Sequence, residues 1–98
     1  MTDSELRALL LDCLALWDRP GQVTAMAHGL EIIVGQERFH LQRAPAEMRP
    51  VRWLLQTPKR RAAARPPRAL PSVVALLAAL RNALGAEGGN GLRIGAPG

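Results

Sequence analysis

Residues 2–17 repeat apolar and polar positions with the period of an α-helix. Thr2 and Glu5 have the spacing of a capping box, and the acidic Asp3 and Glu5 complement the positive end of a helix. Asp18-Arg19-Pro20-Gly21 ends the segment, because proline cannot continue a helix and glycine favours a turn. The pattern predicts an N-terminal helix with one apolar face. That face carries Leu6, Leu9, Leu10, Cys13, Leu14, Leu16 and Trp17.

Between residues 22 and 57 the period changes to the alternation of β-strands. Runs at 30–34, 38–42 and 51–56 alternate apolar and polar residues, and Gly35-Gln36-Glu37 suits a hairpin turn. Residues 23–28 fit either an edge strand or a short helical turn ended by Gly29. We expect an antiparallel meander with one face turned to the helices. That face carries Leu30, Ile32, Val34, Phe39, Leu41, Val51, Trp53 and Leu55.

The remaining residues predict a loop, a second helix and a tail. Residues 57–69 contain Pro58, Pro66 and Pro67, which predict a loop with extended backbone. Pro71-Ser72 opens a helix with an apolar stripe, and Gly85 is expected to end it. Residues 85–98 contain six glycines, which predicts a flexible tail. The stripe consists of Val73, Leu76, Leu77, Leu80 and Leu84.

These elements predict one α+β domain over residues 1–84, ordered α–β–β–β–α, with both helices on one face of a three- or four-stranded antiparallel sheet. A chain of 98 residues has the size of a single domain. A single cysteine excludes an intramolecular disulfide, and the acidic N-terminus is unlike a secretory signal. The apolar stretch at 70–80 is shorter than the ~20 residues of a membrane helix, so we expect a cytoplasmic protein with no membrane partner.

Charge is distributed unevenly along a chain whose net charge is +5. Residues 1–49 carry five arginines against seven carboxylates, and residues 50–98 carry eight basic residues against Glu87 alone. Clustered guanidinium groups suit phosphate, because each presents a planar fork of donors. The same richness in arginine, alanine and glycine also results from a GC-rich genome, in which case this segment is only a solvated loop. The candidate anion-binding residues are Arg52, Lys59, Arg60, Arg61, Arg65 and Arg68.

The outward face of the predicted sheet extends this basic surface. Arg38 and His40 share that face with Gln42, Arg52 and Gln56 by period-2 alternation. A solvent-facing antiparallel sheet has the same composition without any ligand. Trp17 and Trp53 fit core positions, so no aromatic platform for base stacking is expected. Contact with a nucleic acid is therefore predicted to involve its backbone rather than its sequence.

Self-association is the second functional prediction. The helix at 73–84 has a leucine side and an alanine side, so it is suited to pack on two sides. Leu11, Ile33 and Leu54 point away from the predicted core, and a homodimer would cover such apolar surface. The alternative is that the tail or the 44–50 loop covers that side. The predicted interface residues are Leu76, Leu80, Ala75 and Ala79.

Side chains that carry chemistry are scattered. Cys13, His28 and His40 have no paired spacing typical of metal sites, so no metal or cofactor is predicted. No two carboxylates are placed together for acid–base catalysis, so we expect no enzyme. The working hypothesis is a non-enzymatic basic module that contacts an anionic partner, nucleic acid above all, as a homodimer. The rivals are a protein–protein adaptor or chaperone-like dimer, and a small enzyme or regulatory subunit with a site at an oligomer interface.

Overall fold

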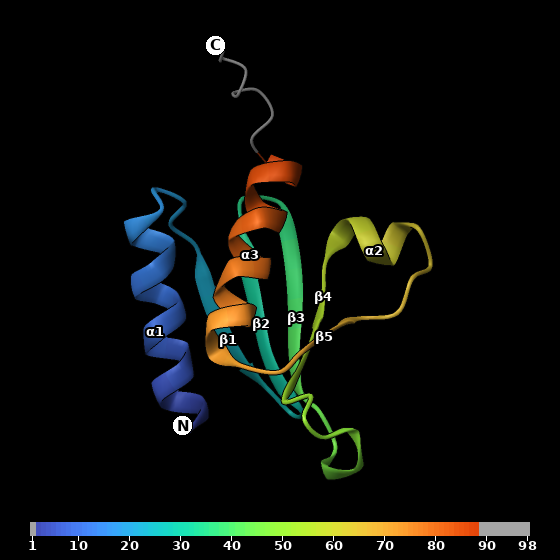
Figure 1. Cartoon of the computed structure of the whole chain (residues 1–98). Helices are drawn as coiled ribbons and strands as arrows, with labels where there is room; N and C mark the ends of the chain where they lie inside the picture. The colour runs from blue at the N-terminus through green and yellow to red at the C-terminus, as the bar shows by residue number, and fades with distance from the viewer. Residues whose placement is uncertain (1, 89–98) are drawn as a thin grey trace.

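A five-stranded antiparallel sheet carries two long helices on one of its faces in the computed structural model, which describes residues 2–88 (Figure 1). The α+β fold predicted from the sequence is confirmed. The elements are α1 (Asp3–Leu16), β1 (Gln22–Met26), β2 (Gly29–Val34), β3 (Glu37–Arg43), the 3-10 turn η1 (Ala46–Met48), β4 (Trp53–Gln56), α2 (Pro58–Ala62), β5 (Arg68–Leu70) and α3 (Val73–Gly88).

Helix α1 begins at the predicted capping box. The backbone N–H of Thr2 donates to the Glu5 carboxylate at 2.8 Å, and the backbone N–H of Glu5 donates to Thr2 Oγ1 at 3.1 Å. The helix ends where Asp18 adopts the left-handed conformation, with φ +60°. Leu6, Leu10 and Leu14 form the buried stripe. The predicted face was too wide, because Leu16 projects away from the stripe and is 82% exposed.

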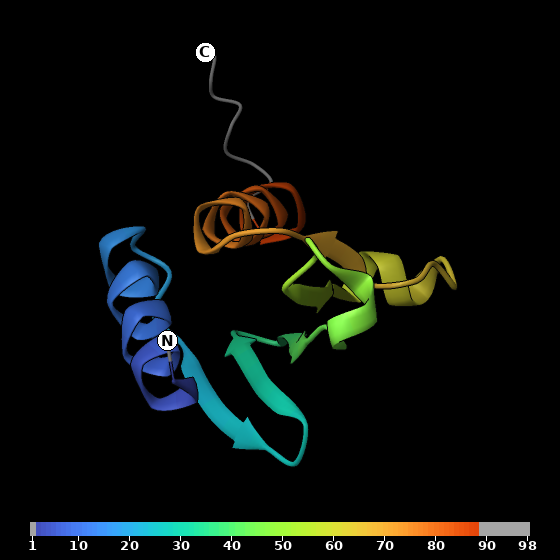
Figure 2. The same cartoon turned by 60° about the horizontal axis from the view of Figure 1, so that its bottom comes forward.

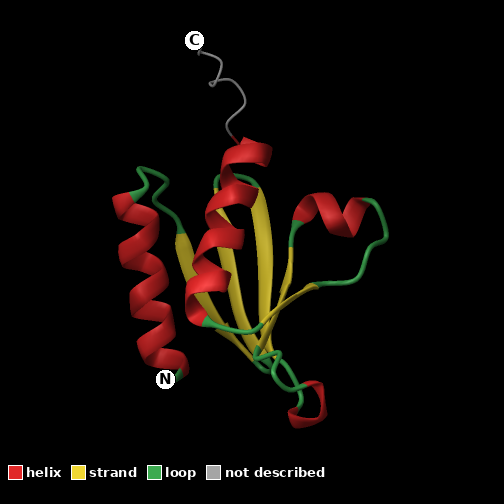
Figure 3. Cartoon of the chain, in the orientation of Figure 1, coloured by secondary structure: helices red, strands yellow, loops and turns green. Residues whose placement is uncertain are grey.

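The strands pair in chain order, β1-β2-β3-β4-β5 (Figure 3). Residues 22–26 form an edge strand rather than a helical turn. The pair Val34 and Glu37 closes the predicted hairpin turn, in which Gly35 has φ +63°. The register brings the predicted apolar residues together on one face, as in the cross-strand pairs Ile32–Phe39, Leu41–Leu55 and Leu30–Leu41.

The prediction of a loop over residues 57–69 was wrong, because this segment contains helix α2 and strand β5. Thr57 caps α2 by accepting a hydrogen bond from the Arg60 backbone N–H at 3.1 Å. Strand β5 consists of three residues and pairs with β4. So short a segment has no alternation to read, and its strand is defined only by pairing with β4. Strand β4 itself begins at Trp53, so Val51 precedes it and is only partly buried.

Helix α3 begins after Ser72, whose Oγ accepts a hydrogen bond from the Ala75 backbone N–H at 3.1 Å. The predicted end at Gly85 was wrong, because the helix continues to Gly88. Glycine in a helix interior costs about 1 kcal/mol relative to alanine, which weakens a helix without ending it. Residues 85–88 of the predicted tail are thus helical, and residues 89–98 lie outside the described residues.

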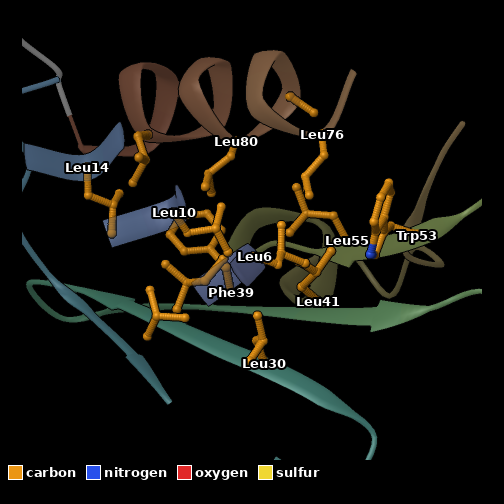
Figure 4. Close-up of a cluster of buried hydrophobic side chains, with 14 of the residues drawn as sticks. Leu6, Leu10, Leu14, Leu30, Phe39, Leu41, Trp53, Leu55, Leu76 and Leu80 are labelled. Atoms are coloured by element: carbon orange, nitrogen blue, oxygen red, sulfur yellow. The ribbon is translucent and has the colours of Figure 1, made fainter. Parts of the chain in front are cut away.

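The hydrophobic core fills the space between the sheet and helices α1 and α3 (Figures 2 and 4). Phe39 and Trp53 are its largest side chains, and both are fully buried. No helix among the described residues covers the opposite face of the sheet, where Ile33 and Leu54 are partly buried as their alternation predicted. Leu11, predicted to point away from the core, packs against its margin.

Candidate anion-binding groove

A groove of about 360 Å³ opens between α2, β5 and α3, on the helix-bearing side of the sheet. Figure 1 shows α2 and α1 on opposite sides of α3, so the groove lies away from α1. We call this site the cationic groove. Its lining residues are Leu55, Thr57, Lys59, Arg60, Ala63, Arg65, Arg68, Ala79, Asn82 and Ala83.

A tight reversal after α2 returns the chain to the groove. Ala64 is left-handed with φ +56°, and the backbone N–H of Arg65 donates to the Arg60 carbonyl at 2.8 Å. A left-handed alanine costs roughly 1–2 kcal/mol, because its Cβ crowds the backbone. Strained residues of this kind concentrate at functional sites. The reversal places Arg60 and Arg65, five positions apart in sequence, on the lining of one groove.

Hydrogen bonds fix this reversal to the sheet. The Nε of Arg60 donates to the Pro66 carbonyl at 2.8 Å, which leaves the outer end of its guanidinium group for other partners. The side-chain amide of Gln56 donates to the Arg65 carbonyl at 3.1 Å. The segment that carries the arginines is thereby attached to the end of β4.

The floor and the far wall come from β4, β5 and α3. Arg68 on β5 is paired with Leu55 on β4, so both side chains project toward the helices. Ala79, Asn82 and Ala83 lie three and four positions apart on α3 and therefore share a face. The methyl groups of the two alanines let the groove extend down to the buried Leu55.

Every polar side chain that lines the groove offers a hydrogen-bond donor. No carboxylate lies among its lining residues in the described part of the chain. Lys59, Arg65 and Arg68 make no ion pair or side-chain hydrogen bond with any described residue. The ion pairs formed within residues 2–85 lie elsewhere. They are Arg19–Glu37, Arg38–Glu31, His40–Glu31 and Arg43–Asp3.

Thr57 is the one buried polar residue of the described chain, with 6% of its surface exposed. Its hydroxyl oxygen accepts the bond that caps α2, and no described residue accepts its proton. A hydroxyl group both donates and accepts, so this proton remains available to a ligand in the groove. The site therefore combines several positive charges with a buried hydroxyl group among its lining residues, an arrangement suited to an anion.

The structure places the other predicted anion-binding residues outside the groove. Arg52 precedes β4, about 13 Å along the strand from Gln56, and its guanidinium carbon lies 5.4 Å from the centre of the Trp53 ring. Arg61 reaches the opposite face of the sheet, where it contacts Nδ1 of His40 at 3.1 Å. The structure thus brings together Lys59, Arg60, Arg65 and Arg68, and separates Arg52 and Arg61 from them.

Arg38 and His40 share the sheet face without a helix, and Glu31 contacts both. Glu31 lies 3.6 Å from Arg38 and 3.1 Å from Nε2 of His40. Nδ1 of His40 lies 3.1 Å from a terminal guanidinium nitrogen of Arg61 on the same face. These residues form a network separate from the cationic groove.

The predicted interface residues lie inside the protein. Leu76, Leu80 and Ala79 are buried, and Ala75 is partly buried. The apolar stripe of α3 faces the sheet, so the chain itself covers these residues. The prediction that they form an exposed dimer interface was wrong for this reason.

Several lining residues were not identified from the sequence. Thr57-Pro58 is a helix-start signal that indicates α2, but nothing in the sequence places Asn82 opposite it. Within residues 2–88, no helix is long and apolar enough to cross a membrane. The described His, Cys, Asp and Glu side chains form no group of three suited to a metal ion. Cys13 is a free, partly buried thiol.

No protein-family model, curated protein or solved structure matches this chain.

Proposed function

We propose that this protein is a non-enzymatic binding module that holds the backbone of a nucleic acid in the cationic groove. One observation carries the proposal: Lys59, Arg60, Arg65 and Arg68 line the same groove, and no described carboxylate lies with them. Cations gathered without counter-charges repel one another, and a bound anion removes that repulsion.

Phosphodiester groups suit these side chains. Arginine presents a fork of donors to two phosphate oxygens at once, and lysine contributes a compact charge. The apolar floor excludes water from one side of the groove, which strengthens each charge interaction above its value in free solution. The net charge of +5 adds a long-range attraction that speeds the first encounter with a polyanion.

The test is fluorescence anisotropy with a labelled nucleic acid over a range of salt concentrations. If the four cations each contact one phosphate of a single strand, the logarithm of affinity falls against the logarithm of salt with a slope of about −3. The double variant Arg65→Glu/Arg68→Glu removes two contacts. It is expected to bind more than tenfold less tightly and to have a slope of about −1.

The control is the double variant Arg49→Glu/Arg81→Glu, which changes the net charge by the same amount. Both of its arginines are exposed, lie outside the groove and make no ion pair with a described residue. It is expected to retain most of the affinity. The proposal is wrong if the wild-type protein does not bind at low salt, or if both double variants lose the same affinity.

A further inference from the structure

The cationic groove has charges at its rim and methyl groups at its floor. Lys59, Arg65 and Arg68 are exposed, whereas Leu55 is fully buried and Ala79 nearly so. A ligand that contacts both the charged rim and the apolar floor needs a phosphate group at the rim and a flat, apolar portion that reaches inward. From this arrangement, together with the proposed function, we infer that the groove binds single-stranded nucleic acid in preference to a duplex, with one base against the floor.

A duplex contacts only the charged rim of the groove. Its phosphates are the outermost groups of the double helix, while the flat faces of its bases are covered by stacking and only the base edges are exposed in the grooves. A single strand turns a base out of the stack, so the phosphate remains with the arginines and the base enters the groove. Contact between a base face and the alanine methyl groups of α3, above all that of the partly exposed Ala83, is thus available to a single strand alone.

The volume of the groove fits this interpretation. About 360 Å³ lies near the lower end of the 300–1,000 Å³ that is typical of small-molecule pockets. It suits one nucleotide unit, with the neighbouring nucleotides lying along the exposed arginines. It does not form an extended channel that follows a double helix.

The groove offers limited means of distinguishing one base from another. No aromatic ring lies among its lining residues, so the base contacts methyl groups and the flat faces of arginine side chains. Asn82 has the one side-chain amide among the described lining residues, and this amide offers both a donor and an acceptor to a base edge. We therefore expect single-strand selectivity with a weak preference among sequences.

A pair of alanine substitutions separates the effect of the apolar lining from the effect of the charges. Ala62 and Ala63 are both exposed at the end of α2, but only Ala63 lines the groove. Ala63→Leu adds bulk to the α2 side of the groove, where it narrows the space for a base, and leaves every cation in place, whereas Ala62→Leu adds the same side chain outside the groove. Since both positions are exposed, neither variant disturbs the core.

The experiment measures anisotropy with one labelled strand of about ten nucleotides, free or annealed to its complement, a length within the known range of single-strand sites. The free strand is expected to bind about tenfold more tightly than the duplex, because only the free strand buries the apolar surface of a base in the groove. Ala63→Leu is expected to remove that difference while the salt dependence stays unchanged, and Ala62→Leu is expected to behave as wild type.

Three results would overturn the inference: equal affinity for strand and duplex, an Ala63→Leu protein that keeps the wild-type preference, or displacement of the strand by poly-glutamate as readily as by unlabelled strand. The first two leave the proposed function standing if Arg65→Glu/Arg68→Glu still weakens binding more than tenfold. Poly-glutamate displacement would identify a general polyanion site. Failure of the protein to bind either nucleic acid would remove both proposals.

Discussion

The Nε of Arg7 on α1 donates a hydrogen bond to the backbone carbonyl of Val23 on β1, at 2.6 Å. Val23 belongs to an edge strand, where backbone groups without a partner invite another chain to pair. The other edge, β5, is three residues long and lies between Pro67 and Pro71, which cannot donate to a further strand. The two edges of the sheet are therefore protected by different means.

Replacing Arg7 with alanine is expected to expose the edge of β1. The loss of one hydrogen bond lowers the free energy of unfolding by about 1 kcal/mol, and the uncovered edge promotes self-association. Urea denaturation measures the first effect, and light scattering over a dilution series measures the second. Arg49→Ala, which removes an exposed arginine far from the edge, is expected to change neither. An Arg7→Ala protein with the stability of wild type and no greater self-association would show that Arg7 does not protect the edge of β1.

Asp18 is expected to limit the stability of α1. It is left-handed at the end of the helix, a conformation that costs a non-glycine residue roughly 1 kcal/mol. Its negative charge also lies at the negative end of the helix dipole. Asp18→Gly is expected to raise the melting temperature by about 4–8 °C, as 1 kcal/mol does in a domain of this size. Asp18→Asn removes the charge alone, so a gain as large as that of glycine would show that backbone strain is unimportant.

Two glycine-to-alanine changes are expected to act in opposite directions. A Cβ on Gly29 overlaps the carbonyl oxygen of Leu41, so Gly29→Ala forces β2 and β3 apart and destabilises the protein. A Cβ on Gly85 meets no atom, and α3 gains about 0.5–1 kcal/mol from alanine. Thermal unfolding of the two variants, followed by circular dichroism, tests the pair. A stabilising Gly29→Ala would show that these strands pack differently.

Glu5 is expected to contribute to stability in a pH-dependent way. The backbone N–H of Thr2, followed by its side chain, holds the pKa of Glu5 below the usual value. A carboxyl group with a lowered pKa in the folded state stabilises the fold above its unfolded pKa of about 4.3, and loses that contribution as the pH falls through the folded value. Glu5→Ala should therefore be less stable than wild type above about pH 5, with the difference narrowing in acid. A difference that stays constant over the pH series would exclude this linkage.

Helices and strands with a regular pattern of apolar and polar residues, or with a local capping or turn signal, could be predicted from the sequence. Elements that depend on pairing with a neighbouring strand could not. The capping box of α1, the β2–β3 hairpin and the start of α3 are local signals that the structure confirms. Strand β5 has only three residues and exists because β4 pairs with it. Gly85 does not end α3, because one glycine lowers helix propensity without preventing the helix.

The candidate site was also predictable only in part, because some of its residues are adjacent in sequence and others are brought together by the fold. Clustering along the sequence identified Lys59, Arg60, Arg65 and Arg68, which share the groove. It also included Arg61, whose direction depends on its place in a helix that the sequence did not predict. Asn82 lies on α3, 14 positions after Arg68 in the sequence. Its place in the groove depends on the packing of α3 against the sheet.

Because the strands lie side by side in the order in which they occur along the chain, each strand pairs with its neighbour in sequence, and the β1–β2 and β2–β3 hairpins close over loops of two residues. Rapid refolding follows from such local pairing, since the entropy lost before the first favourable contact is small. A long-range contact is made by Arg19, which donates to the carbonyl of Leu84 at 3.0 Å and joins the segment after α1 to the C-terminal part of α3. Docking of α3 onto the completed sheet is thus expected to be the late event, and the cationic groove forms only when it is finished.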